Sequence, residues 1–323
     1  MTRIKTLTAS RLAASVIALA LAAGPAFAWT RPGHMVTAAI AFDEIEKRRP
    51  DLIDPIAAIL EAHPDRGAFQ VAVDRSVGRE RQRRLFLECA RWPDDARQTA
   101  YDHPSWHIVL WPTTASDAPA ATKARLAARA DRPTGEALEG LALNYRVLSD
   151  PSTSAADKAV SMCWLLHVTG DIHQPFHTTE LFSAAYPDGD AGAGKQFVVD
   201  PLPPHAPIAL HWLWDDSISR SGVAADADAR ARQIESAYPR AGLDELKTPA
   251  VPPDFRAWAH DESHALAESF ALPARGATSP TPAGATAVSE AYWTKVQAVA
   301  ERRVAIAGYR MADLVIAAMD APK

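Results

Sequence analysis

Two short segments of this sequence place a histidine and an aspartate four residues apart. His167 is followed by Asp171, and His211 is followed by Asp215. Residues four apart lie on the same face of a helix, so each pair would present an imidazole beside a carboxylate. These are ligands expected of zinc in a site that also binds water. One such pair is as well explained by an ordinary core or surface contact, but two pairs together with His177 favour a metal centre.

The first 28 residues have the three parts of a secretory signal peptide. Basic residues precede an apolar run over residues 12–23, and Ala26-Phe27-Ala28 supplies the small residues that a signal peptidase reads. The apolar run is too short to span a bilayer stably. We expect cleavage after Ala28, a mature domain over residues 29–323, and a periplasmic or secreted protein without stable membrane association.

Cleavage after Ala28 would free the α-amino group of Trp29. An α-amino pKa near 8 allows the neutral nitrogen to bind a metal at modest cost. The amine and the carbonyl oxygen of Trp29 can chelate one ion, and His34 from the first helical turn would complete that set. Asp94 and His107 add a further carboxylate and imidazole between this segment and the paired motifs.

In this order, the motifs resemble those of the S1/P1 zinc nucleases, which share a superfamily with bacterial zinc phospholipase C. The shared patterns are Trp-x-x-x-Gly-His at the processed N-terminus, Trp-x-Asp-x-x-Arg, a following His, His-x-x-x-Asp-x-x-Gln-Pro-x-His and His-x-x-x-Asp. The resemblance runs through the mature chain. It implies a single mostly helical domain with long loops and a cleft that holds three zinc ions.

The resemblance also implies which residues bind each ion. The first zinc would be held by Asp94, His107, His167 and Asp171, the second by His177, His211 and Asp215, and the third by Trp29 and His34 with Asp171 shared. Three Zn²⁺ ions against three aspartates would make a strongly positive pocket, which suits a phosphodiester. Zinc lowers the pKa of bound water to about 7 and stabilises a departing oxygen.

The implied substrate is nucleic acid, preferably single-stranded, cleaved at P–O3′ bonds to give 5′-nucleotides, with 3′-nucleotidase activity besides. Arg97 matches the arginine that the family places near the scissile phosphate, where it would neutralise charge in the transition state. Its alternative role is an ion pair with Asp94 or Asp95. Tryptophans beside the ligands, Trp212 among them, either stack on bases or pack in the core.

Two positions depart from the family pattern. The family usually carries a carboxylate three residues after the His107 position, and Leu110 stands there instead. Leucine cannot orient a water molecule, so Asp95, Asp102 and Asp216 are the candidates to compensate. The asparagine of a Gly-Gly-Asn motif is replaced by Lys195, which could meet a phosphate as a point charge.

Two other functions remain open. The first is a lipid phosphodiesterase like zinc phospholipase C, although that branch tends to end the last motif in Glu and this chain has Asp215. The second is a zinc-loaded binding protein that has lost turnover. Retention of all nine ligands argues against the binding protein, because an inactive descendant has no need of an open three-metal site.

The elements that must position these residues are predicted to be helices. Apolar residues recur at the helical period over 38–47, 54–63, 78–91, 135–148, 155–169, 224–237, 255–271 and 289–319. Alternating β-branched residues are scarce and predict strands only at residues 197–199 and at Ile108–Val109. Prolines gather between the helices. The pattern predicts one all-α domain.

Composition limits how this chain could attract a polyanion. The full chain has 34 basic and 39 acidic residues, and loss of the three basic residues in segment 1–28 leaves a mature net charge of −8. Such a chain exerts no global pull on nucleic acid, so a local positive site is needed. The basic run over residues 75–91 either guides a polyanion or forms a solvated helix face.

The chain has two cysteines, Cys89 and Cys163. A buried free thiol is the default expectation for Cys163, which lies in an apolar helical run. An oxidising compartment would permit a disulfide between the two residues, and the sequence leaves this alternative open.

Overall fold

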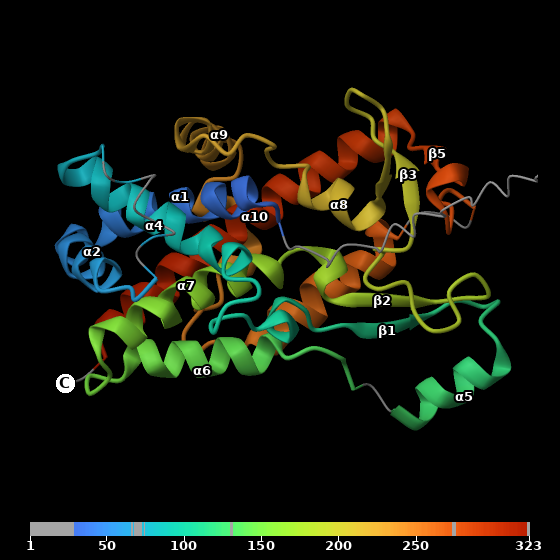
Figure 1. Cartoon of the computed structure of the whole chain (residues 1–323), viewed down its shortest axis with the longest axis horizontal. Coiled ribbons are helices and arrows are strands. Elements are labelled where there is room, and N and C mark those ends of the chain that lie inside the picture. The colour runs from blue at the N-terminus through green and yellow to red at the C-terminus, as the bar shows by residue number, and fades with distance from the viewer. Residues whose placement is uncertain are drawn as a thin grey trace, which may run out of the picture.

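The computed structural model of the chain describes residues 29–65, 67, 73, 75–129, 132–272 and 276–321. The predicted signal peptide, residues 1–28, lies outside the described residues. Helices dominate, and the strands form only small sheets, which confirms the predicted mostly helical fold (Figure 1).

Helix α1 (Arg31–Arg48) lies at the centre of the helical part. All its residues from Gly33 to Phe42 are buried, and a helix that is buried on all sides must be enclosed by others. It packs against α4 (Gly78–Asp95), α9 (Ala224–Ala237) and α10 (Glu290–Met319). A Cβ atom at Gly308 of α10 would lie 2.7 Å from Cβ of Ile40, so this glycine permits the close approach of α1 and α10.

Helix α1 begins earlier than residue 38, where the prediction began it. Pro32 lies in its first turn, where the missing backbone N–H of proline costs nothing. Helix α4 also extends beyond the predicted Arg91, to Asp95, with Pro93 inside its last turn. Both extensions matter for the site, because they carry His34, as its motif predicted, and Asp94 on helices.

Helix α7 (Ala155–Asp171) packs against α4 and α6 (Ala137–Ser149), and α2 (Ile53–Glu61) packs against both α4 and α7. Ser154 caps α7, because its side chain accepts a hydrogen bond from the backbone N–H of Asp157. From residue 159 to its end, nearly every residue of α7 is buried. The C-terminal half of α7 therefore runs through the core and carries His167 and Asp171 with it.

A disulfide joins Cys89 of α4 to Cys163 of α7, with 4.6 Å between the Cα atoms. The free thiol expected by default at Cys163 is therefore wrong, and the open alternative is the one present. Burial alone could not distinguish the two, because a thiol and a disulfide both prefer the core. The bond fastens together two helices that each carry candidate ligands.

Replacing Cys89 and Cys163 together with alanine is expected to lower the free energy of unfolding by about 4 kcal/mol, because the disulfide closes a loop of 74 residues in the unfolded chain. Urea unfolding of the metal-free protein measures this, since bound metal would add its own stabilisation. Wild-type protein treated with a reductant should behave like the double variant. An unchanged unfolding midpoint in both would contradict the prediction.

Two small sheets complete the fold. Strand β1 (Trp111–Thr114) pairs in parallel with β2 (Thr179–Phe182). Strand β3 (Phe197–Val199) lies between β4 (Pro207–Ala209) and β5 (Thr286–Ala287). The short helix α8 (Leu210–Asp215) follows β4 directly. These sheets hold the segments after His107 and His177 side by side, and they place α8 next to them.

Several predicted elements differ from the observed ones. The predicted strand at Ile108–Val109 is wrong in position, because the strand is β1, whereas β3 is confirmed at residues 197–199. Helix α5 (Ala120–Arg129) and helix α8 were not among the predicted helices. The segment predicted at 255–271 contains the wider π-helical turns Ala257–His264 and Ala267–Ala271, which a 3.6-residue period does not distinguish from an α-helix. The other predicted helices are confirmed, with ends shifted by a few residues.

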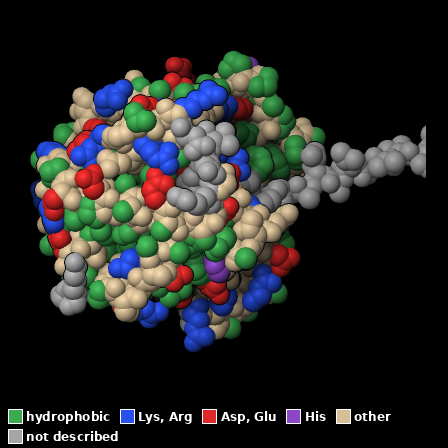
Figure 2. All heavy atoms as spheres, turned by 60° about the vertical axis from the view of Figure 1, so that its left-hand side comes forward, with side chains coloured by type: hydrophobic (Ala, Val, Ile, Leu, Met, Phe, Trp, Pro, Cys, Tyr) green, Lys and Arg blue, Asp and Glu red, His purple; other side chains and the backbone are tan. Residues whose placement is uncertain are grey.

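Basic and acidic side chains are interspersed on the face shown in Figure 2, without a broad basic area. The basic run before Asp94 is largely paired with carboxylates: Arg83 contacts Asp43 and Asp228, and Arg81 contacts Glu61. This pairing favours the solvated-face interpretation of the run. Among the residues that the structure describes, no helix combines the length and the apolar character that crossing a bilayer requires.

Candidate metal centre

The candidate ligands come together in the interior between α1, α4, α7 and α8. All nine are at most 2% exposed: Trp29, His34, Asp94, His107, His167, Asp171, His177, His211 and Asp215. Eight of them form three groups whose ligand atoms lie within 4.8 Å of one another: His34, His167 and Asp171; Asp94, His107 and His167; and His177, His211 and Asp215. Each group is a histidine and aspartate set that could hold a metal ion.

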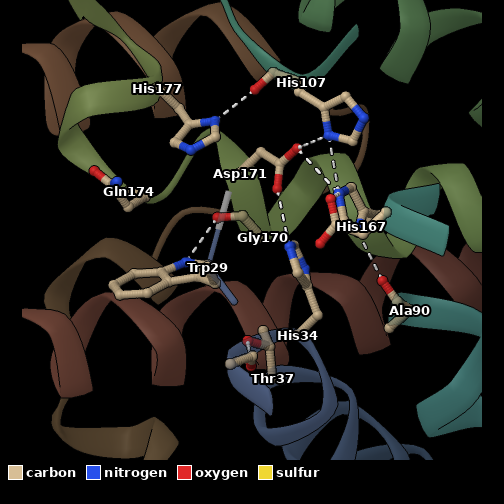
Figure 3. A network of polar contacts seen from close by, with 12 residues as sticks. Trp29, His34, Thr37, Ala90, His107, His167, Gly170, Asp171, Gln174 and His177 are labelled. Carbon is tan, nitrogen blue, oxygen red and sulfur yellow. Dashed lines mark hydrogen bonds and ion pairs between the residues drawn. The ribbon is translucent and has the colours of Figure 1, made fainter. Parts of the chain in front are cut away.

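His167 links the first two groups. Its Nε2 lies 3.0 Å from Nδ1 of His107, 3.5 Å from Oδ2 of Asp171 and 3.9 Å from Oδ1 of Asp94 (Figure 3). His167 and Asp171 share one face of α7, as their spacing predicted, whereas Asp94 reaches them from the last turn of α4. The helix packing of α4 on α7 thus brings together residues more than 70 positions apart.

The two carboxylate oxygens of Asp171 face different histidines. Its Oδ2 lies 3.2 Å from Nδ1 of His107, and its Oδ1 lies 3.3 Å from Nε2 of His34 (Figure 3). The ring of His34 stacks on that of His167, with centroids 3.7 Å apart. A Cβ atom at Gly170 would lie 3.1 Å from Nδ1 of His34, so this glycine allows α1 and α7 to approach closely here.

The third group lies on the other side of Asp171. Nε2 of His211 is 3.0 Å from Nε2 of His177 and 3.4 Å from Oδ2 of Asp215. The other oxygen of Asp215 accepts a hydrogen bond from the side-chain amide of Gln174 at 2.7 Å. Gln174 is fully buried. It therefore ties the turn that carries His177 to the helix that carries Asp215, and it fixes the orientation of that carboxylate.

Backbone carbonyls determine which imidazole nitrogens face inward. Nδ1 of His167 donates to the Ala90 carbonyl at 2.8 Å, Nδ1 of His177 to the His107 carbonyl at 2.6 Å, and Nδ1 of His211 to the Gly192 carbonyl at 2.5 Å. A neutral imidazole carries one proton, so each Nε2 is left with a lone pair. Metal-binding histidines are commonly oriented in this way.

This arrangement allows a direct test of whether a cation fits. The inward Nε2 atoms of His177 and His211 lie 3.0 Å apart, and both rings turn Nδ1 away toward a backbone carbonyl. A cation placed beside the two Nε2 atoms could bind both of them. Oδ2 of Asp94 and Nε2 of His107 have no hydrogen-bond partner among the described residues. Buried polar atoms normally have partners, so the donor set fits a metal.

Burial controls the charge of these groups. It lowers the pKa of His34 and of His107 well below the ordinary value, with neighbouring imidazoles adding to the effect, and it lowers the pKa of His167 to about 3. These three imidazoles are therefore neutral, and their contacts with aspartates are not ion pairs. Burial raises the pKa of Asp94 to about 7 and that of Asp171 well above its ordinary value. Without a bound cation, ionising these buried carboxyl groups costs free energy.

Trp29 lies against the first two groups. Its side chain is fully buried, and its Nε1 donates to the Gly170 carbonyl at 3.0 Å (Figure 3). The next residue, Thr30, donates from its backbone nitrogen to the Asp215 carbonyl at 3.4 Å. These contacts place residue 29 between α7 and α8, next to His34. The predicted cleavage site and the N-terminal motif pointed to Trp29 as a ligand through its backbone, since a tryptophan side chain binds no metal.

Three residues that the sequence singled out besides the candidate ligands are Arg97, Lys195 and Leu110, and each lies at a different place around the site. Arg97 lies beside the site, with a guanidinium nitrogen 3.5 Å from Oδ1 of Asp94. Lys195 donates from Nζ to the Gly189 carbonyl at 2.8 Å, a contact within its own loop. Leu110 is buried, and its side chain faces Gly192, whose carbonyl orients His211.

A cavity of about 410 Å³ opens beside the candidate ligands Asp94 and Asp215. Of the three carboxylates considered for the position of Leu110, Asp216 lines this cavity and pairs with Arg220, whereas Asp95 pairs with Arg31 and Arg91. The third of these carboxylates, Asp102, accepts a hydrogen bond from the backbone N–H of Gln98.

Three further residues line this cavity: Trp212, which the sequence placed either against a base or in the core, and Arg31 and Arg220, which were not assigned to the site. Arg31 was visible within the N-terminal motif, and Trp212 lies between His211 and Asp215. Arg220 carried no sequence signal.

Comparisons with known proteins agree with this geometry. A search of curated proteins finds no match. The family model described as S1/P1 Nuclease matches residues 29–320, which is nearly the whole chain and includes every candidate ligand. Nucleases of this family are metal-dependent and hydrolyse phosphodiester bonds, and the three histidine and aspartate groups are suited to bind metal. The match over this length shows that the chain belongs to the S1/P1 nuclease family.

Proposed function

We propose that this chain is an exported zinc-dependent nuclease that hydrolyses single-stranded nucleic acid at P–O3′ bonds, releases 5′-nucleotides and also removes 3′-phosphates. The observation that carries the proposal is the buried group of His177, His211 and Asp215, in which the two Nε2 atoms lie 3.0 Å apart, in a chain from this family. Such a site is suited to a cation, and a cation-rich site is suited to a phosphodiester.

Three zinc ions per chain are proposed. The first is held by Asp94, His107, His167 and Asp171, the second by His177, His211 and Asp215, and the third by the amine and carbonyl of Trp29 with His34, sharing Asp171. The two oxygens of Asp171 face different groups, which supports its shared role. The family match begins at Trp29, which supports the proposed mature N-terminus.

When bound, zinc would supply Lewis-acid stabilisation and a water of lowered pKa. The residues of the chain have other tasks. The carbonyls of Ala90, His107 and Gly192 hold three imidazoles in the tautomer that can bind metal. Gln174 orients Asp215. Arg97 is one-sixth exposed beside Asp94, where a guanidinium can meet a phosphoryl oxygen that enters from the cavity.

The water-orienting carboxylate of the family is absent because Leu110 occupies its position. Asp216 is proposed to take over this role, because it lines the same cavity as Asp94 and Asp215. Burial raises the pKa of Asp216, and the nearby Arg220 opposes that shift. A carboxylate with such a partner can stay ionised and accept a hydrogen bond from water.

Two other functions are weaker alternatives. A lipid phosphodiesterase would need the same metals, but the family match favours nucleic acid as substrate. A binding protein without turnover would have no use for a cavity that opens directly onto two ligand carboxylates. Export is supported by the disulfide, since such bonds persist in oxidising compartments. The proposed location is therefore periplasmic or secreted.

The test is a paired measurement on the purified mature protein. Zinc is counted per chain, and turnover is compared on single-stranded DNA, RNA, a 3′-nucleotide and phosphatidylcholine, with and without chelator. We expect close to three zinc ions and nucleic-acid cleavage that the chelator abolishes. Three zinc ions with lipid hydrolysis, or with no turnover, would overturn the substrate assignment and leave the ligand assignment intact.

A further inference from the structure

The cavity beside the metal ligands has walls suited to more than a phosphate. Its volume of about 410 Å³ falls within the range of about 300–1,000 Å³ typical of small-molecule sites. One wall is the indole of Trp212, and the guanidinium groups of Arg31 and Arg220 also line it. An aromatic face together with two phosphate-binding side chains is the donor set that nucleotides require.

Trp212 differs from the other tryptophans around the site. It is 38% exposed, whereas Trp29 and Trp214 are fully buried in the core. Its neighbours His211 and Leu213 are also fully buried. On a helix, the residue after His211 is rotated by about 100° from it. The indole therefore projects away from the ligand groups and into the adjoining cavity, in agreement with its place in the cavity lining.

The two arginines retain hydrogen-bonding capacity despite their carboxylate partners. Arg31 contacts Asp95 at 2.6 Å with half of its side chain exposed. Arg220 contacts Asp200 at 2.8 Å and Asp216 at 3.3 Å with a third of its side chain exposed. A guanidinium has five N–H donors, more than these contacts use. Each side chain is thus held near the cavity by its acidic partner and can still bind a phosphate.

We propose that Trp212, Arg31 and Arg220 form a subsite for a nucleotide next to the scissile phosphate. The base stacks on Trp212, and the two arginines bind its phosphate. This inference rests on the proposed nuclease function and extends it. Every base has a π-face, so stacking gives affinity without sequence preference. A base inside a duplex is already stacked and paired, so the subsite selects single strands.

The charge of the cavity separates this ligand from a choline lipid. A quaternary ammonium group would also bind an indole face, through a cation–π contact. The guanidinium groups of Arg31 and Arg220 line the same cavity and would repel that cation. Three carboxylates also line it, but Asp94 and Asp215 are proposed to bind zinc, and Asp216 is paired with Arg220. A nucleotide fits both features of the cavity, because its anionic phosphate can bind the two arginines and its neutral base can stack on Trp212.

The experiment uses the zinc-loaded mature protein and two substrates of equal length, a single-stranded DNA oligonucleotide and its fully abasic backbone. The measured quantity is the ratio of kcat/KM for the two substrates. Trp212→Ala is expected to lower this ratio roughly tenfold, within the range measured for base–aromatic stacking, and Trp212→Phe to lower it less. Zinc content per chain should stay that of the wild type.

Arg31→Gln and Arg220→Gln are expected to raise KM for both substrates and to reduce its salt dependence, because each removes a phosphate contact. Two controls match these variants. Leu143→Ala changes an apolar side chain of similar exposure on α6, and Arg125→Gln changes an exposed arginine paired with Asp188. Both controls should behave like the wild type.

The outcomes separate the subsite from the nuclease function. A wild-type enzyme that cleaves the oligonucleotide, with an unchanged substrate ratio in Trp212→Ala, would refute the subsite and leave the nuclease standing. A zinc-loaded wild type that cleaves neither substrate would refute the proposed function itself. A lowered ratio in Trp212→Ala with normal zinc content supports the subsite.

Discussion

His177→Ala is expected to lower nuclease turnover by at least about a hundredfold while the helical fold stays intact. Loss of an outer-shell partner of a metal ligand typically costs about 10- to 100-fold, and a direct ligand should cost no less. Nε2 of His177 lies 3.0 Å from that of His211, and the two share one group with Asp215. Without His177, that group keeps one imidazole and one carboxylate, too few to hold an ion firmly.

The measurements are turnover on single-stranded DNA, zinc content per chain and far-UV circular dichroism. We expect the loss of about one zinc ion and an unchanged helical signal. His260→Ala is the matched control, because His260 is a half-buried imidazole that pairs with Asp261 outside the three groups. Wild-type hydrolysis by the His177→Ala protein would rule out the assignment of the second zinc.

Asp171→Asn is expected to have the second large effect, because Asp171 serves two groups at once. Its Oδ1 faces His34 and its Oδ2 faces His107. An amide keeps one oxygen and loses the negative charge, so both the first and the third zinc should bind more weakly. Turnover should fall by at least as much as in His177→Ala, with the loss of more than one zinc ion per chain.

The same substitution should not destabilise the metal-free protein. Burial raises the pKa of Asp171 well above its ordinary value, and the nearby Asp94 adds to this shift, which means that its charge is costly where it lies. An amide of the same shape carries no charge to bury. Thermal unfolding in chelator should therefore occur at the wild-type temperature or higher, whereas in zinc it should occur at a lower one. Asp188→Asn, at an exposed site, should change neither temperature. A large drop in the stability of the metal-free variant would indicate a structural and not a metal-binding role.

The chemistry of the site could be inferred from the sequence because the relevant side chains follow local rules. The spacing of His167 and Asp171 places them on one helical face wherever α7 lies, and the same holds for His211 and Asp215 on α8. The mostly helical fold followed from apolar periodicity in the same way. The order of the motifs pointed to the S1/P1 nuclease family, and the match of the family model shows that the chain belongs to it.

Other features depend on contacts between segments distant in the chain. Periodicity began α1 too late and ended α4 too early, because the turns that contain Pro32 and Pro93 lie outside the periodic apolar runs. The pairing of Cys89 with Cys163 requires α4 to lie against α7, and no local pattern specifies that contact. The same is true of Gln174, whose partner Asp215 lies 41 residues away.

What the sequence by itself determined is therefore the inventory of ligand-type side chains, their local spacing and the helical class. Only the tertiary structure decided that eight of these side chains meet in three buried groups, that the inward nitrogens of His177 and His211 lie 3.0 Å apart, and that Trp212, Arg31 and Arg220 line one cavity. The physical reason is that spacing fixes a direction on one helix, whereas distance between helices follows from how their side chains pack together in the core.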